Sequence, residues 1–261
     1  MPSKVIVNAD DFGLNAHTNA VILHAFQAGL ISSATAMANM PAFAAACMMA
    51  QHPVLKGRVG LHFNLTYGRP LSKAILAETR LCSAQGEFEM GLKRRTLRLS
   101  RAERAAIQQE LEAQWQHCLD NGLVPSHVDS HQHVHNIWPI GEVVARFARS
   151  KGVPVRLARN VGNNIGLAKR VFKALLNRRI RQLSGATADY VCTPADLKAG
   201  LAPEHGILEV VAHPSALGGK DFGDAYLAAG ESLKQLVDQQ LGHRPRVGYA
   251  VVTASSLAPM A

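Results

Sequence analysis

Short runs of apolar and β-branched residues alternate along the chain with segments whose apolar residues recur every three or four positions. The short runs predict strands, and the longer periodic segments predict helices. The eight predicted strands have the sequences KVIVNA, SSATAMAN, RVGLHFNLT, PSHVDSH, VPVRLAR, DYVCT, ILEVVAH and RVGYAVV.

Helices are predicted between most of these strands. Residues 18–30 carry apolar side chains at helical spacing, and Gly29 suits the end of that helix. Ser100 and Glu103 have the spacing of a capping box, which predicts a helix that starts there and runs to Gly122. Further helices are predicted over residues 41–51, 136–151, 166–183 and 230–241.

The alternation of strands and helices indicates parallel βα units. Closing such units predicts an α/β fold of the distorted TIM-like (β/α) barrel type. No linker or repeat divides the chain, so residues 1–261 are expected to form a single domain. A long insertion around residues 67–100 is expected to cover one edge of the active-site mouth, with substrate specificity determined by residues 71–104.

Charge and hydropathy restrict the possible partners. The net charge is +9, and the positive residues concentrate in residues 93–104 and 169–181 without regularly placed aromatic residues, so no nucleic-acid partner is expected. A solvated helix face is the simpler interpretation of these charges, and the basic amphipathic stretch over residues 169–182 could also touch a membrane surface. No apolar run is long enough for an integral membrane segment and none resembles a signal peptide, so a cytoplasmic location is expected. The four cysteines form no CxxC pair and are expected to be reduced thiols.

Two adjacent carboxylates, Asp10 and Asp11, follow the first predicted strand. In a β/α barrel, this end of the strand is the catalytic end. Neighbouring residues there point in different directions, so one acid could coordinate a metal while the other faces water bound to it. The alternative is a helix cap beside a solvated turn.

Histidines supply the second candidate group. His62 alone would be interpreted as a core residue, but in the segment HVDSHQHVH, residues 127–135, polar groups occupy every second position. A strand would project them onto one face. Because buried imidazoles need hydrogen-bond partners or a metal, a metal site is the better interpretation. Arg156 and His213 lie near the ends of two further predicted strands, where a salt bridge or a helix cap is the alternative for each.

Four motifs, VNADDFGLN, GLHFNLTYGRPLS, HVDSHQHVH and EVVAHPS, occur in this order between Val7 and Pro214. Together they resemble the motif set of the YdjC-like carbohydrate deacetylases. That family includes chitooligosaccharide deacetylases and relatives from the hopanoid pathway, and HVDSHQHVH is closer in motif to the chitooligosaccharide branch.

The resemblance implies one divalent metal ion, Mg²⁺ or Zn²⁺, held by Asp11, His62 and His131. It also implies that Asp10 is the general base. His213 is the candidate to protonate the departing amine, and Arg156 is the candidate to orient Asp10. The residues expected to support the metal ligands or the substrate are His127, Asp129 and His133. A homodimer is possible by the same resemblance.

Three functions are therefore compared. The first is hydrolysis of N-acetyl groups on a small amino-sugar substrate such as a chitooligosaccharide. The second is a metal-dependent phosphoesterase, which would need several further ligands for a site of two or three metals. The third is a non-catalytic protein that binds sugar or metal on the same scaffold.

Overall fold

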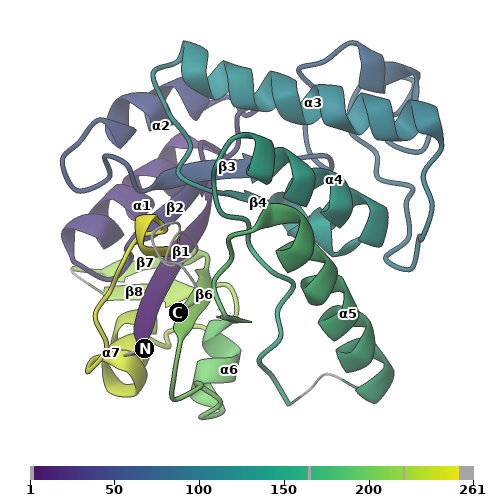
Figure 1. Ribbon diagram of the computed structural model, residues 1–261. Coiled ribbons are helices and arrows are strands. Elements are labelled where there is room, and N and C mark those ends of the chain that lie inside the picture. The colour runs from purple at the N-terminus through teal and green to yellow at the C-terminus, as the bar shows by residue number, and fades with distance from the viewer. Residues whose placement is uncertain (1–2, 164–165, 220, 253–261) are drawn as a thin grey trace.

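The computed structural model describes residues 3–163, 166–219 and 221–252 of a single-domain α/β fold. A curled sheet of six parallel strands runs through it in the order β4-β3-β2-β1-β6-β5 (Figure 1). The strands are β1 (Lys4–Phe12), β2 (Ser33–Ala36), β3 (Val59–Phe63), β4 (Val128–Ser130), β5 (Tyr190–Cys192) and β6 (Ile207–Ala212).

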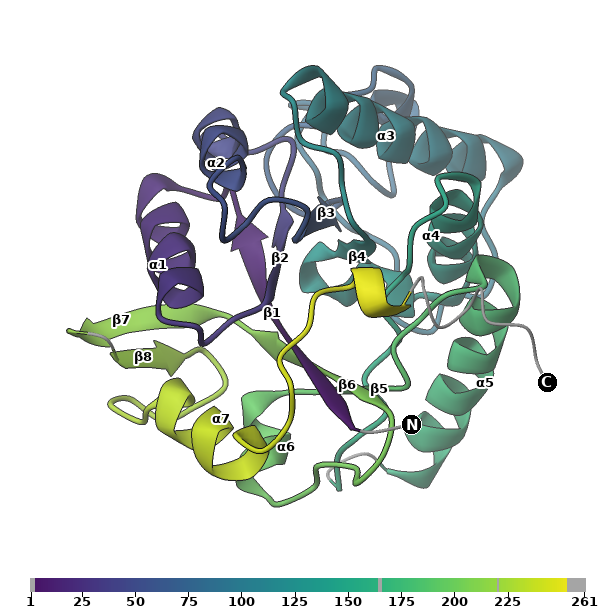
Figure 2. The ribbon, with the colours of Figure 1, turned by 60° about the vertical axis from the view of Figure 1, so that its left-hand side comes forward.

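Helices surround the outside of this sheet, as Figure 2 shows. Ser100 and Glu103 form the predicted capping box at the start of α3. The helices are α1 (Ala16–Gln27), α2 (Phe43–Ala50), α3 (Arg101–Asp120), α4 (Trp138–Ser150), α5 (Leu167–Ser184), α6 (Pro194–Lys198) and α7 (Leu233–Leu241), with short 3₁₀ helices η1 (Ala74–Ala77) and η2 (His131–Asn136). No helix in the described ranges has the length and apolar character needed to cross a membrane.

The central strands are buried on both faces, as parallel strands covered by helices are. Every residue of β2, β3, β4 and β6 is buried. Close packing of β3 on its neighbour requires glycine at position 60, because a Cβ there would lie 2.5 Å from His127 Nδ1 and 2.6 Å from the His127 carbonyl oxygen. The apolar runs of the sequence thus form the strands that carry the candidate site.

Two predicted strands are reduced to single bridges. In VPVRLAR, Val155 bridges to Val128 of β4, and in RVGYAVV, Arg246 bridges to Val5 of β1. The strand pairings show a curled half-barrel, and the closed TIM-like barrel stays a prediction. A two-stranded antiparallel hairpin, β7 (Pro214–Gly218) with β8 (Asp221–Asp224), was not predicted.

The prediction of one strand through residues 127–135 is wrong after Ser130. There β4 ends and η2 begins, and Gln132 and His133 have positive φ angles of 48° and 53°. The Ser130 hydroxyl oxygen accepts from the His135 backbone N–H at 3.1 Å and lies 2.6 Å from His135 Nδ1. These contacts fold the chain back on itself, so the histidines point to several sides.

The insertion between β3 and α3 contains one short helix, η1, and one isolated bridge between Cys82 and Phe88 among its described residues. The Glu110 carboxylate of α3 fixes its start by accepting from two backbone N–H groups, Leu71 at 3.0 Å and Ser72 at 2.7 Å. Near its end, Arg94 donates to the carbonyl oxygens of Gln132 and His133. The insertion therefore reaches the loop that follows β4.

Candidate active site

The carboxyl end of β1 carries Asp10 and Asp11, and a local distortion of the strand makes their side chains point in different directions. The register with β2 shifts between Ala9 and Phe12, and Asp11 has a φ of 67°. A positive φ at a residue other than glycine costs about 1–3 kcal/mol and persists where the surrounding structure enforces it. Asp10 is buried and turns inward, whereas Asp11 faces the histidines of β3 and η2.

One oxygen of Asp11 lies between two imidazoles. Asp11 Oδ1 is 3.2 Å from His62 Nε2 and 2.8 Å from His131 Nδ1. The ligand atoms of these three residues all lie within 4.8 Å of one another. The structure thus brings together Asp11, His62 and His131, the three residues that the sequence suggested as metal ligands.

Asp129 and Thr35 fix the ring of His62. His62 Nδ1 lies 2.6 Å from Asp129 Oδ1, and the Thr35 hydroxyl donates to Asp129 Oδ2 at 3.0 Å. Burial would lower the pKa of His62, but the carboxylates of Asp129, Asp10 and Asp11 outweigh burial and raise it to about 10. His62 therefore directs Nε2 toward Asp11, in a surrounding of carboxylates that favours positive charge.

Asp10 is held by a buried guanidinium. Arg156 donates through both terminal nitrogens to the two Asp10 oxygens, each at 2.7 Å, and Asn8 Nδ2 donates to Oδ1 at 2.9 Å. Burial would raise the pKa of Asp10, but Arg156 and the nearby imidazoles hold that pKa well below its usual range. Asp10 is therefore an oriented carboxylate, and among its described contacts Oδ2 has fewer hydrogen bonds than Oδ1.

Arg156 joins several acids in one network. Besides Asp10, it contacts Asp129 Oδ2 through NH1 at 2.6 Å and Glu209 Oε1 through Nε at 2.6 Å. The Tyr249 hydroxyl donates to the other Glu209 oxygen. Burial raises the pKa of Glu209, and Arg156 opposes that shift. All five side chains are buried, so the orientation of Asp10 depends on a network in the protein interior.

His213 follows β6 and faces both aspartates. Its Nε2 lies 4.0 Å from Asp10 Oδ2 and 3.9 Å from Asp11 Oδ2, and its ring packs edge-on against Tyr226. Asp224 Oδ2 accepts from the His213 backbone N–H at 2.6 Å, so the β7–β8 hairpin holds this histidine in place. The hairpin missed by the sequence therefore positions a predicted site residue.

The described hydrogen bonds of His127 and His133 go to groups other than the three candidate ligands. His127 is buried, with Nε2 3.2 Å from Asn8 Oδ1 and its ring stacked on Tyr249 at 3.7 Å between ring centroids. It thus reaches Asp10 only through Asn8. His133 Nε2 lies 3.4 Å from the Tyr226 hydroxyl, and burial lowers the pKa of His133 to about 3. His133 is therefore a neutral group on the wall of a pocket.

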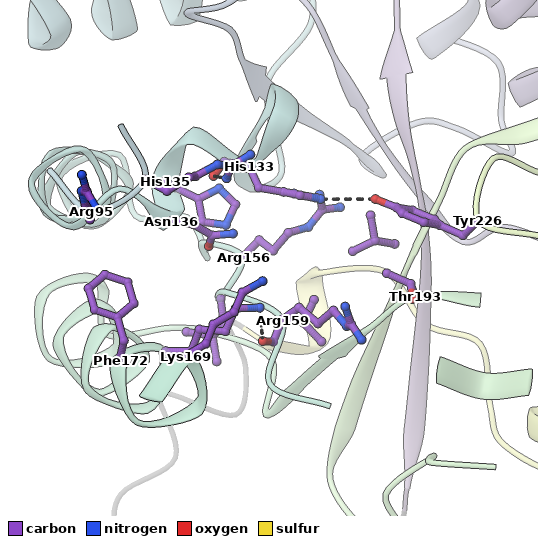
Figure 3. Close-up of a pocket in the computed structure, with 15 residues that line it drawn as sticks. Arg95, His133, His135, Asn136, Arg156, Arg159, Lys169, Phe172, Thr193 and Tyr226 are labelled. Atoms are coloured by element: carbon purple, nitrogen blue, oxygen red, sulfur yellow. Dashed lines mark hydrogen bonds between the residues drawn. The ribbon is translucent and has the colours of Figure 1, made fainter. Parts of the chain in front are cut away.

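A pocket of about 560 Å³ adjoins this centre, and its lining includes His133, Arg156 and Tyr226 (Figure 3). Among the described residues that line it there is no acid, and Asp11, His62 and His131 are not part of the lining. Apolar side chains such as Phe172 and Val211 form part of its surface. Its basic lining residues are Arg94, Arg95, Arg156, Arg159, Lys169 and Lys173.

Comparison with known proteins identifies the family of this chain. The family model described as "YdjC-like protein" matches residues 4–241. The chain belongs to the YdjC-like family. It is 41% identical to a carbohydrate deacetylase of Geobacillus stearothermophilus over 77% of this chain and 83% of that protein. It is 43% identical to a chitooligosaccharide deacetylase of Yersinia pestis over 64% of each chain.

A solved structure also shares the fold of this YdjC-like chain. The Enterococcus faecalis protein described as a "putative cellobiose-phosphate cleavage protein" superposes with a TM-score of 0.69 over 96% of this chain and 99% of its own, at 21% identity. At that identity, the likeness shows the fold alone.

The donor set of this YdjC-like chain fits one divalent cation. A carboxylate oxygen and two imidazole nitrogens converge, as in mononuclear sites with open positions for water and substrate. The carboxylates of Asp10, Asp11 and Asp129 raise the pKa of His62, so this position stabilises positive charge. A cation held by Asp11, His62 and His131 would lie in the same negative surrounding.

Several site residues were missed by the sequence analysis. Glu209 is the single acid within the apolar run ILEVVA, and that signal could have identified it. Thr35, Tyr226 and Tyr249 give no comparable signal, because each lies in an ordinary strand-like or polar context. Only the folded chain brings them to the candidate ligands and to Arg156.

Proposed function

We propose that the chain is a divalent-metal-dependent hydrolase that removes N-acetyl groups from a small amino sugar such as a chitooligosaccharide. The single observation that carries the proposal is the contact of Asp11 Oδ1 with both His62 and His131, next to an Asp10 carboxylate oriented by Arg156. The relatives named as carbohydrate and chitooligosaccharide deacetylases support the reaction class.

A divalent ion bound by Asp11, His62 and His131 would supply Lewis-acid polarisation of the acetamide carbonyl and increase the acidity of water. Asp10 Oδ2 accepts a proton as water adds to the carbonyl carbon. His213 Nε2 donates a proton to the sugar nitrogen as the C–N bond breaks, which leaves acetate and an amine. The separation of 4.0 Å between His213 Nε2 and Asp10 Oδ2 supports the assignment of these two groups as acid and base of one reaction.

The pocket supports a refinement of the substrate. Its apolar surface suits the face of a sugar ring, and its basic side chains favour a sugar that carries an anionic group. Arg159 is already paired with Asp196 at 2.6 Å, so the positive charge for binding an anion comes mainly from Arg94, Arg95, Lys169 and Lys173. The insertion around residues 67–100 supplies Arg94 and Arg95, in agreement with its expected role in specificity.

The phosphoesterase alternative is disfavoured by Arg156. Asp10, His62 and Asp129 form a second cluster that could in principle hold an ion. However, the Arg156 guanidinium already binds both Asp10 oxygens and one Asp129 oxygen. A second cation there would oppose a fixed positive charge. One bound ion per chain by elemental analysis would agree with deacetylation, and two or three ions would favour the phosphoesterase.

The proposal is tested by acetate release from diacetylchitobiose and longer chitooligosaccharides, with chelator-treated protein and single divalent ions restored. We expect activity to depend on the added ion and to be lost in Asp11→Ala, His131→Ala and Asp10→Asn. Exposed His17→Ala is the control for loss of an imidazole. Ion binding without turnover of any sugar would instead support the non-catalytic alternative. The homodimer and the cytoplasmic location remain predictions.

A further inference from the structure

Helix α5 leaves an apolar stripe uncovered on the outside of the molecule. Leu167, Val171 and Leu175 are 78%, 52% and 52% exposed, and their four-residue spacing places them along one side of the helix. The opposite side packs inward through Leu176 and Ile180. Figures 1 and 2 both show α5 at the periphery, so no other described element covers this stripe.

The charge on α5 has one sign. The helix has no Asp or Glu, and its basic residues are Lys169, Arg170, Lys173, Arg178, Arg179 and Arg181. Arg179 pairs with Glu142 of α4, and Lys173 and Arg181 donate to the backbone carbonyls of Arg159 and Asp189. Within the described part of the chain, Arg170 and Arg178 form no ion pair, so their charges are available to an anionic partner, whereas Lys169 lines the pocket.

We infer that the exposed face of α5 binds the surface of a membrane that contains anionic phospholipids. Apolar side chains of a surface helix insert below the headgroups, while Lys and Arg beside them attract anionic lipids. On α5 the stripe and the free charges fit this arrangement, because Arg170 and Arg178 each lie three residues after a residue of the stripe, Leu167 and Leu175.

Other partners fit this face less well. Two copies of the chain joined through it by a two-fold axis would place like charges against each other. Nucleic acid would use the charges but would leave the aliphatic stripe exposed to water, and no aromatic platform lies among the exposed residues of α5. A lipid surface would bury the apolar stripe and would also bind the basic side chains.

The same helix forms a wall of the pocket through Lys169, Phe172 and Lys173. Binding by α5 would therefore bring the pocket close to the bilayer surface. The inference does not depend on the deacetylase activity, because membrane binding can be measured without turnover.

The test is co-sedimentation of the full-length protein with vesicles of phosphatidylglycerol and phosphatidylcholine, compared with phosphatidylcholine alone. We expect binding to the anionic vesicles that weakens with salt, and little binding to the neutral ones. The double variant Val171→Glu with Leu175→Glu should lower the partition coefficient by about tenfold or more. The matched control is Met48→Glu with Val124→Glu, which adds the same charge at two positions that are each 72% exposed.

The control variant should bind like the wild type, and Arg170→Gln with Arg178→Gln should reduce binding of a chain whose apolar stripe is intact. Circular dichroism checks that each variant is folded. If wild-type protein ignores anionic vesicles at low salt, or if the α5 and control variants lose binding equally, the inference is wrong. It is also wrong if α5 instead mediates a dimer detected by ultracentrifugation, or binds an oligonucleotide but no vesicle.

Discussion

Arg156 and Asp10 form a two-pronged ion pair in the core, with each terminal nitrogen of the guanidinium 2.7 Å from one oxygen of the carboxylate. Arg156 also contacts Asp129 and Glu209. Asp10, the proposed base, and Asp129, which supports the proposed ligand His62, therefore share one guanidinium group. Because the geometry is planar and bidentate, an ammonium group cannot reproduce it.

Two replacements of Arg156 should therefore separate the contribution of its positive charge from that of its bidentate hydrogen bonds to Asp10. Arg156→Met leaves buried carboxylates unpaired and should lower the free energy of unfolding by about 3–5 kcal/mol. Arg156→Lys should restore part of that stability but little of kcat. Urea denaturation and acetate release measure the two effects, and Arg146→Lys on α4 is the control. Full activity in Arg156→Lys would show that the bidentate geometry is dispensable.

Tyr249 should act on the site through Glu209. Tyr249→Phe removes the donor to a buried Glu209 oxygen and should cost about 1–3 kcal/mol of stability. Without this hydrogen bond, Glu209 positions Arg156, and through it Asp10, less accurately. We therefore expect kcat to fall with little change in KM. Partly exposed Tyr190→Phe is the matched control. A change in KM with unchanged kcat would place Tyr249 in substrate binding instead.

Asp129 should set the affinity for the metal without contacting it. In Asp129→Asn, His62 loses its charged partner at Nδ1, and the affinity for Zn²⁺ should fall by about 10–100-fold. Titration of chelator-treated protein with Zn²⁺ measures this, and Asp120→Asn at the end of α3 provides a surface control. An unchanged affinity in Asp129→Asn would contradict the assignment of His62 as a ligand supported by Asp129.

Gly60 should be intolerant of any side chain. In Gly60→Ala, the new methyl group would lie 2.5 Å from His127 Nδ1 and would force β3 and β4 apart. Overpacking of this kind costs about 1–3 kcal/mol or more. Thermal unfolding measures the loss. Gly166→Ala, with no atom within 4 Å of the added carbon, should change the melting temperature little.

Lys173 gives a pH dependence to the pocket. Burial, with help from the Arg159 and Lys169 charges, lowers the pKa of Lys173 to about 8, so the side chain is charged below that pH and neutral above it. For a phosphorylated chitooligosaccharide, KM should rise as the pH increases through about 8, whereas the neutral sugar should show no such rise. Lys173→Arg should remove the rise, and its persistence in that variant would exclude Lys173 as the source.

The local sequence pattern determined much of the fold, and its motifs identified candidate site residues. The apolar runs correspond to the six paired strands because a parallel sheet buried on both faces needs continuous apolar residues. The resemblance of the motifs to the YdjC-like family singled out Asp10, Asp11, His62 and His131, whereas their positions alone left a helix cap and core packing as alternatives. The tests of their roles are those given above.

Tertiary structure decided which groups each of these side chains contacts. The sequence suggested one strand face for residues 127–135, but β4 ends at Ser130, and Gln132 and His133 have positive φ angles. As a result, His131 contacts Asp11, whereas His133 lies in the pocket wall beside Tyr226. Thr35 and Tyr249 belong to the site only because distant segments meet there. Hydrogen bonds act over about 3 Å in space, and separation along the chain carries no information about them.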